Sequence, residues 1–482
     1  MPKVTMNTVR NVKLLPIAGA LILLAGCSSL APDYTRSELP VPATWQNQPD
    51  ADSQGLSNQQ AMQVPFKHFI KDTRLTQVID LALSNNRSLR QTLADVEAAR
   101  ESYRIQRADL VPQLDIGLSG NRSKASGSIN STYEADVGLS GYEIDLFGKN
   151  RSLSEAQMEA YLASAETAKA AKIALISEIA NAWLTLAADQ SALQLATETE
   201  SNAQQTLAIT QKRLSLGVDS QIDLANAETV YHSARSDSAL YTTQVAQDLN
   251  ALHLLVGQPF DENLLPDALP DSENLVTDVP AGLSSSVLLQ RPDVLAAEHN
   301  LKSANANIGA ARAAFFPSLS LTTTGGVASS VLADIFSGGA STIWTLAPSL
   351  TLPIFDSGAN DASLAYSEAQ QRKQLAAYEY AIQTAFSEVA DALARRATIQ
   401  AQLNAEEALV NAASRSYSLS LARYQNGVDS FQNTLEAQRT MYSAKQSLIS
   451  TRQTDLTNRI TLYRVLGGGL APSDSETIKV SP

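Results

Sequence analysis

The chain has 482 residues, of which 44% are hydrophobic, and its formal net charge is −13. A chain of this length can bury a large core, but an acidic protein is a poor nucleic-acid binder, because phosphate recognition needs basic patches. Cys27 is the only cysteine. The exported chain therefore has no intrachain disulfide, and packing and assembly must stabilise it.

The N-terminus is predicted to be a signal peptide, residues 1–26. Basic residues precede an apolar run over residues 14–25 that is too short to span a bilayer. The run ends in Leu24-Ala25-Gly26-Cys27, which resembles a lipobox. In a lipobox the cysteine becomes the first residue and carries covalent N-acyl and S-diacylglycerol lipid. The alternative is a free thiol in an ordinary signal peptide. Ser28 follows instead of Asp, which by the bacterial sorting rule indicates the outer membrane.

Residues 27–64, rich in Pro, Ser, Gln and Asn, are expected to form an extended, lipid-anchored tether. A polar tail is expected at residues 470–482. No run of about 18 apolar residues follows the leader, so we expect no transmembrane helix. Passage through a membrane would then require strands in a closed barrel.

The rest of the chain contains an internal repeat. Gly217-Val218-Asp219-Ser220 recurs as Gly427-Val428-Asp429-Ser430, an offset of 210 residues, and Arg213 and Arg423 precede the two copies equally. Such self-similarity indicates duplication. It predicts a first repeat at 65–257, an equatorial connection at 258–287 and a second repeat at 288–469.

Each repeat is predicted to contain a helix, two strands and a long helical hairpin. The first helix is expected from about Leu75 to Arg107, and its counterpart begins near Arg291-Pro292-Asp293, where Pro suits a first helical position. Period-two alternation, as at Leu114, Ile116 and Leu118, predicts strands at about 113–147 and 317–355. Strands with one apolar face are typical of a membrane barrel, although a soluble sandwich is the alternative.

The long hairpins are expected at about 150–256 and 360–466. From Ser152 to Leu214 there is no Pro or Gly, enough for roughly 90 Å of helix. Apolar positions step by three and four, as in a coiled coil. Four strands cannot close a barrel, so several chains must contribute strands. Three chains would give twelve strands and a lumen, but the sequence does not fix that number.

The chain resembles the TolC-like outer-membrane factors, and most closely their lipoprotein branch, the OprM or NodT-like type. The resemblance runs from the lipobox to the C-terminal glycines. Its motifs are Tyr142-Glu143-Ile144-Asp145-Leu146-Phe147-Gly148, Arg291-Pro292-Asp293-Val294, Ala311-Arg312-Ala313-Ala314-Phe315-Phe316-Pro317, Leu352-Pro353-Ile354-Phe355, the two Gly-Val-Asp turns, and Leu466-Gly467-Gly468-Gly469.

The resemblance implies a mainly helical homotrimer with a twelve-stranded outer-membrane barrel, a coiled periplasmic helical barrel and a mixed equatorial domain. Such a channel sits in outer-membrane lipid and extends into the periplasm. There it would meet a periplasmic adaptor protein and an inner-membrane RND-type pump, and conduct drugs or other small toxic compounds passively. The alternatives are a duct for ABC-type protein secretion and a structural envelope lipoprotein. Substrate range and partner identity are not readable from the chain.

The same resemblance assigns roles at the periplasmic tip. Asp223 and Tyr424 would form a link that keeps the tip closed, unless Asp223 only caps a helix. Glu436 would form a carboxylate ring at the constriction, or lie on a solvated helix face. Phe431 would narrow the pore or pack between helices. Asp219 and Asp429 belong to the tip, and the adaptor-contact positions are Gly217, Val218, Ser220, Gly427, Val428 and Ser430.

Three residues depart from the family pattern near this tip, namely Gln425, Gln432 and Asn433, and they leave the strength of the gate open. Nothing in the chain indicates an enzyme. The histidines His68, His232, His253 and His299 have no metal-ligand spacing, and no nucleophile elbow or Walker loop is present. We therefore expect no catalytic residue, no metal and no cofactor other than the lipid.

Overall fold

The computed structural model describes residues 29–45, 65–276 and 284–468, so Cys27 and the predicted signal peptide lie outside it. The chain forms two compact units. The first contains residues 29–38, 95–165 and 296–379, and the second contains the remaining described residues. Each unit takes segments from both sequence repeats. The two compact units therefore do not correspond to the two sequence repeats.

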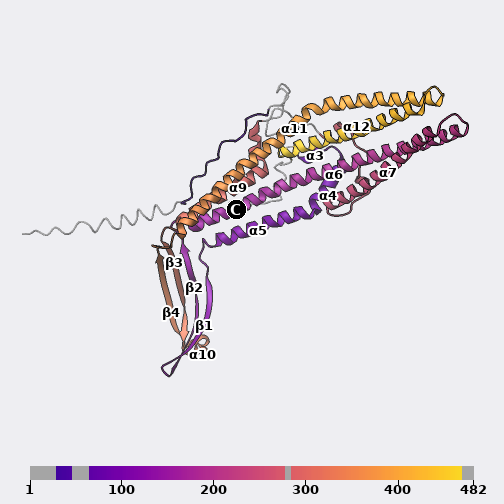
Figure 1. Ribbon diagram of the computed structural model, residues 1–482. Helices are drawn as coiled ribbons and strands as arrows, with labels where there is room; N and C mark the ends of the chain where they lie inside the picture. The colour runs from indigo at the N-terminus through magenta and orange to yellow at the C-terminus, as the bar shows by residue number, and fades with distance from the viewer. Residues whose placement is uncertain (1–28, 46–64, 277–283, 469–482) are drawn as a thin grey trace, which may run out of the picture. The chain divides into compact units, whose positions relative to one another are not determined.

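The first unit contains an antiparallel sheet with strand order β1-β2-β3-β4 (Figure 1). Both predicted strand pairs are confirmed. A register shift between Leu139 and Tyr142 adds a bulge to the second strand. The connection between the last two strands contains a short helix that was not predicted. The bounds are β1 Asp115–Ala125, β2 Ser128–Ile144, β3 Ser318–Ser329, α10 Leu332–Ser337 and β4 Ser341–Thr351.

One face of this sheet is apolar, and no described part of the chain covers it. The register places Ile116 beside Val137, Val137 beside Gly325, and Gly325 beside Trp344, so these residues share a face. Ile116 is 88% exposed and Trp344 is 76% exposed. The predicted alternation of an apolar and a polar face is therefore confirmed, because side chains in a strand point alternately to opposite sides.

Two long helical hairpins follow the two strand pairs, as predicted. The helices are α6 Lys149–Ser215, α7 Gln221–Val256, α11 Ala359–Gln425 and α12 Phe431–Val465. In the second unit, the fully buried Trp183 donates its indole N–H to the carbonyl of Leu264 at 3.1 Å. Many of the other buried residues in this unit are alanines, such as Ala180 and Ala187, and their small side chains let helices approach closely.

The sequence analysis predicted no membrane-spanning helix, but one described helix passes the usual test for such a helix. Among the described residues, α6 contains a stretch that is long and apolar enough to cross a membrane by length and composition alone. More than half of that stretch is buried inside the chain. Burial of this kind is typical of the core helix of a helical bundle, so the stretch needs no lipid to cover it.

The expected single helix from Leu75 to Arg107 is wrong, because the chain breaks at Asn86. The Asn86 side chain accepts from the N–H of Leu89 at 2.7 Å and donates to the carbonyl of Leu255 at 2.7 Å. It therefore caps a new helix and joins it to α7. The helices are α3 Phe66–Phe69, α4 Thr73–Asn85 and α5 Arg87–Ala108.

The counterpart helix, α9 Pro292–Ala313, starts at the predicted proline. Arg291 before it is 5% exposed and binds Glu388 at 2.8 Å and the carbonyl of Val465 at 2.7 Å. The Arg-Pro-Asp motif thus both starts a helix and ties three segments of the second unit together. The equatorial connection contains short helices and a bridge between Ile70 and Val276. These helices are η1 Glu262–Leu264, α8 Ser272–Leu275 and η2 Ser285–Gln290.

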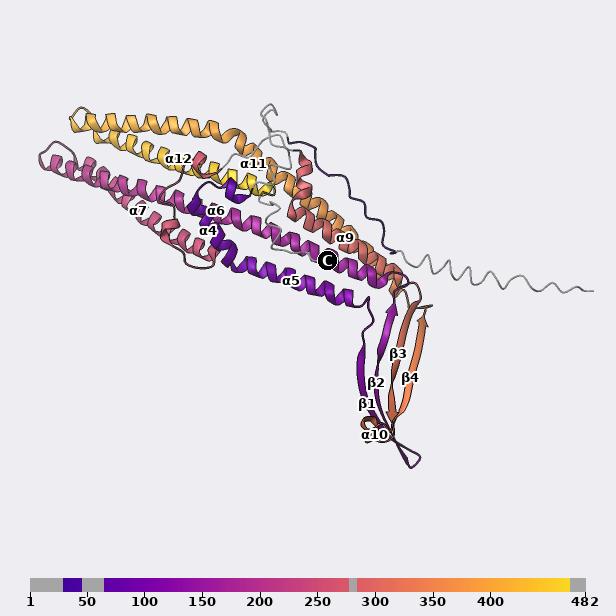
Figure 2. The same ribbon diagram turned by 180° about the vertical axis from the view of Figure 1, so that it is seen from behind.

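The described part of the expected tether, residues 29–45, has no regular structure but is packed against the chain (Figure 2). In the first unit, Asn305 donates to the carbonyl of Pro32 at 2.7 Å, and Arg36 pairs with Glu298 at 2.7 Å. Gly309 allows the close approach, since a Cβ there would lie 2.7 Å from the nitrogen of Ala31. The part of the expected tether that the structure describes is therefore held against the first unit by these contacts.

Candidate functional site

The two Gly-Val-Asp-Ser turns have the same backbone. We call them the 217 turn (217–220) and the 427 turn (427–430). Gly217 and Gly427 have φ values of 74° and 73°, in the left-handed region that favours glycine. The valine N–H of each turn donates to an arginine carbonyl five residues back at 2.9 Å, which ends the preceding helix. Val218 and Val428 are each 61% exposed, so both turns present an apolar side chain at a hairpin tip.

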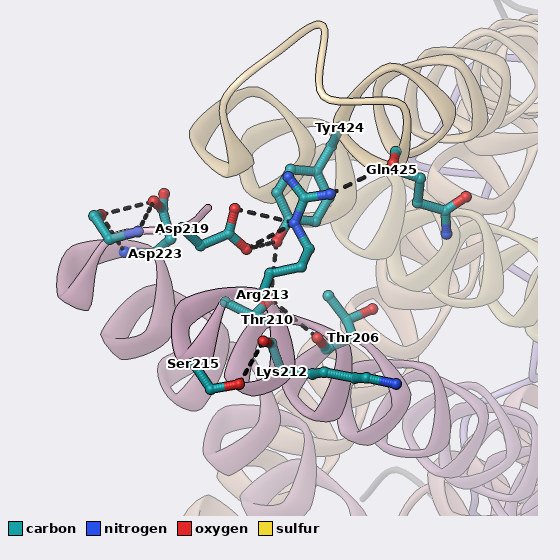
Figure 3. Close-up of polar contacts among 10 residues, drawn as sticks. Thr206, Thr210, Lys212, Arg213, Ser215, Asp219, Asp223, Tyr424 and Gln425 are labelled. Atoms are coloured by element: carbon teal, nitrogen blue, oxygen red, sulfur yellow. Dashed lines mark hydrogen bonds and ion pairs between the residues drawn. The ribbon is translucent and has the colours of Figure 1, made fainter. Parts of the chain in front are cut away.

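The side chains around the 217 turn form a nearly buried charged group. Asp219, whose side chain is 6% exposed, accepts from Nε of Arg213 at 3.0 Å through both carboxylate oxygens. The Tyr424 hydroxyl donates to Oδ2 of the same carboxylate at 2.6 Å. Figure 3 shows the phenol and the guanidinium meeting at this carboxylate. The contact joins the α6–α7 hairpin to the end of α11.

Two further contacts hold Tyr424 in place. The Arg213 guanidinium lies 4.7 Å from the centre of its ring, a cation–π distance. The Thr210 hydroxyl lies 3.0 Å from the Tyr424 hydroxyl. Burial and the hydrogen bond to Asp219 raise the pKa of Tyr424 to about 12, so the phenol stays neutral at physiological pH. We call Thr210, Arg213, Asp219 and Tyr424 the tip cluster (Figure 3).

Apolar packing supports the tip cluster from α12. Phe431 is 1% exposed, and its ring centre lies 5.2 Å from that of Tyr424. Ala227 and Leu435 complete the buried group. Of the two predicted roles for Phe431, packing between helices is therefore the one that the structure supports, because a buried ring cannot line a pore.

The predicted contact between Asp223 and Tyr424 is wrong within this chain. Asp223 instead accepts from the N–H of Ser220 at 3.0 Å, while the Ser220 hydroxyl accepts from the N–H of Asp223 at 3.2 Å. This reciprocal pair is a capping box at the start of α7. Asp219 takes the place that the prediction gave to Asp223, because the turn directs Asp219, not Asp223, toward α11.

The 427 turn has no such cluster. Asp429 pairs with Arg423 at 2.5 Å, but the Arg423 side chain is 57% exposed. The arginine lowers the pKa of the Asp429 carboxyl through this hydrogen bond. Ser430 occupies the N-cap position of α12, yet its side chain makes no capping hydrogen bond. The position that corresponds to Asp223 is Asn433.

Glu436 lies on an exposed face of α12, where it accepts from the Gln432 side chain at 3.1 Å. A ring of three such carboxylates needs other copies of the chain, so that role stays a prediction. Gln425 contributes only its backbone carbonyl, which accepts from Arg213 at 3.4 Å. Of the three departures from the family pattern, Gln425 therefore contacts the tip cluster through its backbone alone.

The sequence analysis missed Arg213 and Thr210 as members of the tip cluster. It also missed a second phenol–carboxylate contact, in which the Tyr442 hydroxyl donates to Asp237 at 3.1 Å. Burial and the Asp237 charge raise the pKa of Tyr442. Both phenol–carboxylate pairs have the same separation of 205 residues. A search for Asp and Tyr at a constant offset near the repeat length would have found them.

The described part of the chain holds no group of three or more His, Cys, Asp or Glu that could bind a metal. His299 contacts Glu159. Cys27, the predicted lipidation site, lies outside the described residues.

Comparisons with known proteins agree with this fold. The family described as "Outer membrane efflux protein" matches residues 78–258 and 283–468. The chain is 42% identical to the probable efflux pump outer membrane protein TtgC of Pseudomonas putida, over 95% of both chains. It is 40% identical to the outer membrane protein OprJ of Pseudomonas aeruginosa, covering 84% of this chain and 85% of that one. The open state of the MtrE outer membrane channel of Neisseria gonorrhoeae superposes on this chain with a TM-score of 0.84 at 36% identity. The match covers 92% of this chain and 99% of that one.

Proposed function

Because the chain belongs to the outer membrane efflux protein family, we propose that it is the outer-membrane channel of a tripartite efflux pump. In this role it carries small molecules to the cell exterior and supplies no energy of its own. One structural arrangement carries the proposal. A sheet with an exposed apolar face is joined to long helical hairpins, and a charged cluster holds the tips of these hairpins together. Relatives named for solvent and antibiotic efflux support drugs and other small toxic compounds as the cargo.

The sheet explains why the working channel needs several chains, and a trimer fits it. One chain has four strands, with β1 and β4 at free edges. An open edge cannot face lipid, because its N–H and C=O groups would have no partners there. Three chains placed edge to edge supply twelve strands and close a barrel wide enough for a lumen. Its apolar face, with Ile116 and Trp344, meets lipid.

The tip cluster supplies the gate. Separating the α6–α7 hairpin from α11 must break the bond from Tyr424 to Asp219 and expose a nearly buried arginine–carboxylate pair. A hydrogen bond to a charged group contributes about 1.5–3 kcal/mol. The resting tip is thus held closed within each chain, and opening requires a partner that binds the separated hairpins more tightly.

A periplasmic adaptor is that partner, and an RND-type inner-membrane pump drives transport through it. The two exposed valines, Val218 and Val428, offer matching apolar contacts at the hairpin tips. Their equal exposure supports the pairing of one adaptor element with each turn. Both turns remain accessible while the tip cluster is intact, so docking can precede opening.

We further propose that Cys27 carries the predicted lipid. The Ser29 hydroxyl lies 3.2 Å from that of Ser152, close to the start of α6 and hence to the end of β2. Ser29, which follows Cys27 by two residues in the sequence, therefore lies at the end of the sheet where β2 leads into α6. An acyl chain there can enter the adjoining leaflet. Mass spectrometry of the mature N-terminal peptide would test this, because the added mass of the lipid should be present in the wild type and absent in Cys27→Ala.

Single-channel conductance of the purified trimer in a planar bilayer tests the gate. Wild type should show small, cation-preferring conductance, and Tyr424→Phe should open about tenfold more often, because it removes only the hydroxyl. Tyr380→Phe, at a residue 70% exposed, is the matched control. Unchanged conductance in Tyr424→Phe would be consistent with a channel but would contradict the proposed gate. No conductance from a well-folded trimer would overturn the channel and favour a structural lipoprotein.

A further inference from the structure

The charged residues of the sheet are separated by face. The register puts the acidic side chains on the face opposite to Ile116, Val137 and Trp344. The two basic residues of the sheet, Arg122 and Lys124, lie on the apolar face with Ile116 and Leu118. The acidic residues of the sheet are Asp115, Glu134, Asp136 and Glu143.

This separation is unusual for a face that meets lipid. A cation is costly at the middle of a bilayer and tolerated near its surface. Arg122 and Lys124 lie near one end of the sheet and not at its middle. Both are within five residues of the β1–β2 turn, where Ser126 and Gly127 have positive φ. The helices join the sheet at its other end, where β2 leads into α6. In the proposed channel, the turn end therefore reaches the outward leaflet.

Neither cation has a counter-ion in the described residues. Both are exposed, and no ion pair involves them. The acidic side chains of the sheet point to the other face, and Asp334 of α10 accepts from the Ser329 hydroxyl at 2.9 Å. In a closed barrel β1 meets β4 of the neighbouring chain, and the sequence of β4 contains no charged residue. The strand that would meet β1 therefore supplies no acidic partner for either cation.

Aromatic residues mark the same face. The Tyr133 ring lies over Gly120, since a Cβ there would be 2.9 Å from the ring. Gly120 is two residues before Arg122 on the same face. Tyrosine and tryptophan are typical of the boundary between hydrocarbon and headgroups. Two cations just beyond such a boundary face headgroups, and not the acyl chains.

We propose that Arg122 and Lys124 form a binding site for the phosphate groups of a phosphorylated glycolipid in the outward leaflet. Residues two apart on one strand are about 7 Å apart along it, so the two cations can contact neighbouring phosphates of one headgroup. Arginine suits this role because its planar donors bind phosphate in pairs. The proposal rests on the proposed function only for the direction in which the sheet crosses the membrane.

Retention of lipid A by the detergent-purified, full-length trimer tests this site. The trimer is mixed with micelles that contain bis-phosphorylated lipid A, passed over a sizing column and examined for bound lipid by native mass spectrometry. Arg122→Gln with Lys124→Gln should reduce retained lipid A at least fivefold. The charge-preserving exchange Arg122→Lys with Lys124→Arg should retain it. Arg372→Gln with Lys373→Gln removes the same two charges from exposed positions on α11 and should change nothing.

Equal retention by wild type and the Arg122, Lys124 double variant would overturn the site, as would an equal loss in the α11 control. Equal retention of lipid A and its dephosphorylated form by the wild type would also overturn it, because the phosphate groups would then not be what the site binds. If the double variant does not assemble, Arg122→Gln and Lys124→Gln are tested singly, with a partial loss expected from each. Conductance separates the two hypotheses. A trimer that retains lipid A through these cations but never conducts would remove the proposed function and keep the lipid site.

Discussion

The two hairpin turns carry the same four residues and lie in different environments. In the 217 turn, Asp219 is nearly buried and binds both Arg213 and Tyr424. In the 427 turn, Asp429 binds only Arg423, which is largely exposed. The backbone is the same in both, down to the 2.9 Å hydrogen bond from each valine N–H. The motif therefore determines the turn, and the residues around it determine whether its aspartate joins two hairpins.

Three differences between the repeats produce this asymmetry. Tyr424 stands where the first repeat has Leu214, and Phe431 stands where it has Gln221. The first repeat has Asp223 where the second has Asn433, so only α7 has a capping box. Duplication produced two equivalent turns. A few substitutions then gave the aspartate of the 217 turn a partner, Tyr424, just before the 427 turn. The first three predictions below each change one side of this comparison and set it against the equivalent residue of the other repeat.

Phe431→Ala should have the largest effect. It leaves a cavity beneath Tyr424, and such a truncation costs about 3–5 kcal/mol when the ring is fully buried. Amide exchange at the end of α11 and the start of α12 should quicken by about 100-fold or more. Gln221→Ala, at the exposed equivalent, should leave exchange at its own turn unchanged. Similar exchange in both variants would show that Phe431 does not support the tip cluster.

Asp219→Ala should open the channel more than Asp429→Ala. It leaves Arg213 and the Tyr424 hydroxyl without their shared acceptor, at a cost of about 2–3 kcal/mol for a pair that is mostly buried. An exposed pair contributes about 0–1 kcal/mol, so loss of Asp429 should be nearly silent. Single-channel open probability measures both. Equal effects would mean that the two turns are functionally equivalent despite their different burial.

Asp223→Ala distinguishes a cap from a gate. Losing a capping interaction costs about 1 kcal/mol, so exchange in the first residues of α7 should quicken about fivefold while conductance stays at the wild-type level. Asn433→Asp should slow exchange at the start of α12 by a similar factor, because it completes a capping box with Ser430. A rise in conductance in Asp223→Ala would restore the gate role that the sequence first suggested.

The smallest expected effect is that of pH. Burial and the Asp219 carboxylate raise the pKa of Tyr424 to about 12. The folded state holds this proton more tightly than the unfolded state, whose tyrosines have a pKa of about 10. The contribution of Tyr424 to closure is therefore complete below about pH 10 and is lost as the pH rises toward 12. Ultraviolet titration of wild type against Tyr424→Phe should place its ionisation there. Ionisation near pH 10 would show an exposed phenol.

The sequence by itself determined the elements and their order. Period-two alternation located all four strands, the absence of Gly and Pro located the long helices, and the repeated glycines located both turns. These are local properties, set by backbone geometry and by the side on which each residue falls. The apolar face of the sheet could be predicted for the same reason. The family resemblance then supplied the trimer and the channel.

Only the tertiary structure decided which partners meet. Asp219 lies in the 217 turn and Asp223 follows that turn by three residues. Spacing cannot say which one reaches Tyr424, because that depends on how α6 packs against α11. The break at Asn86 depends on the Leu255 carbonyl, which is 169 residues away. The packing of residues 29–45 has no periodic signal, since Gly309 and Glu298 of α9 create it. Local sequence determines the shape of each element, whereas contacts between distant elements depend on all of them at once.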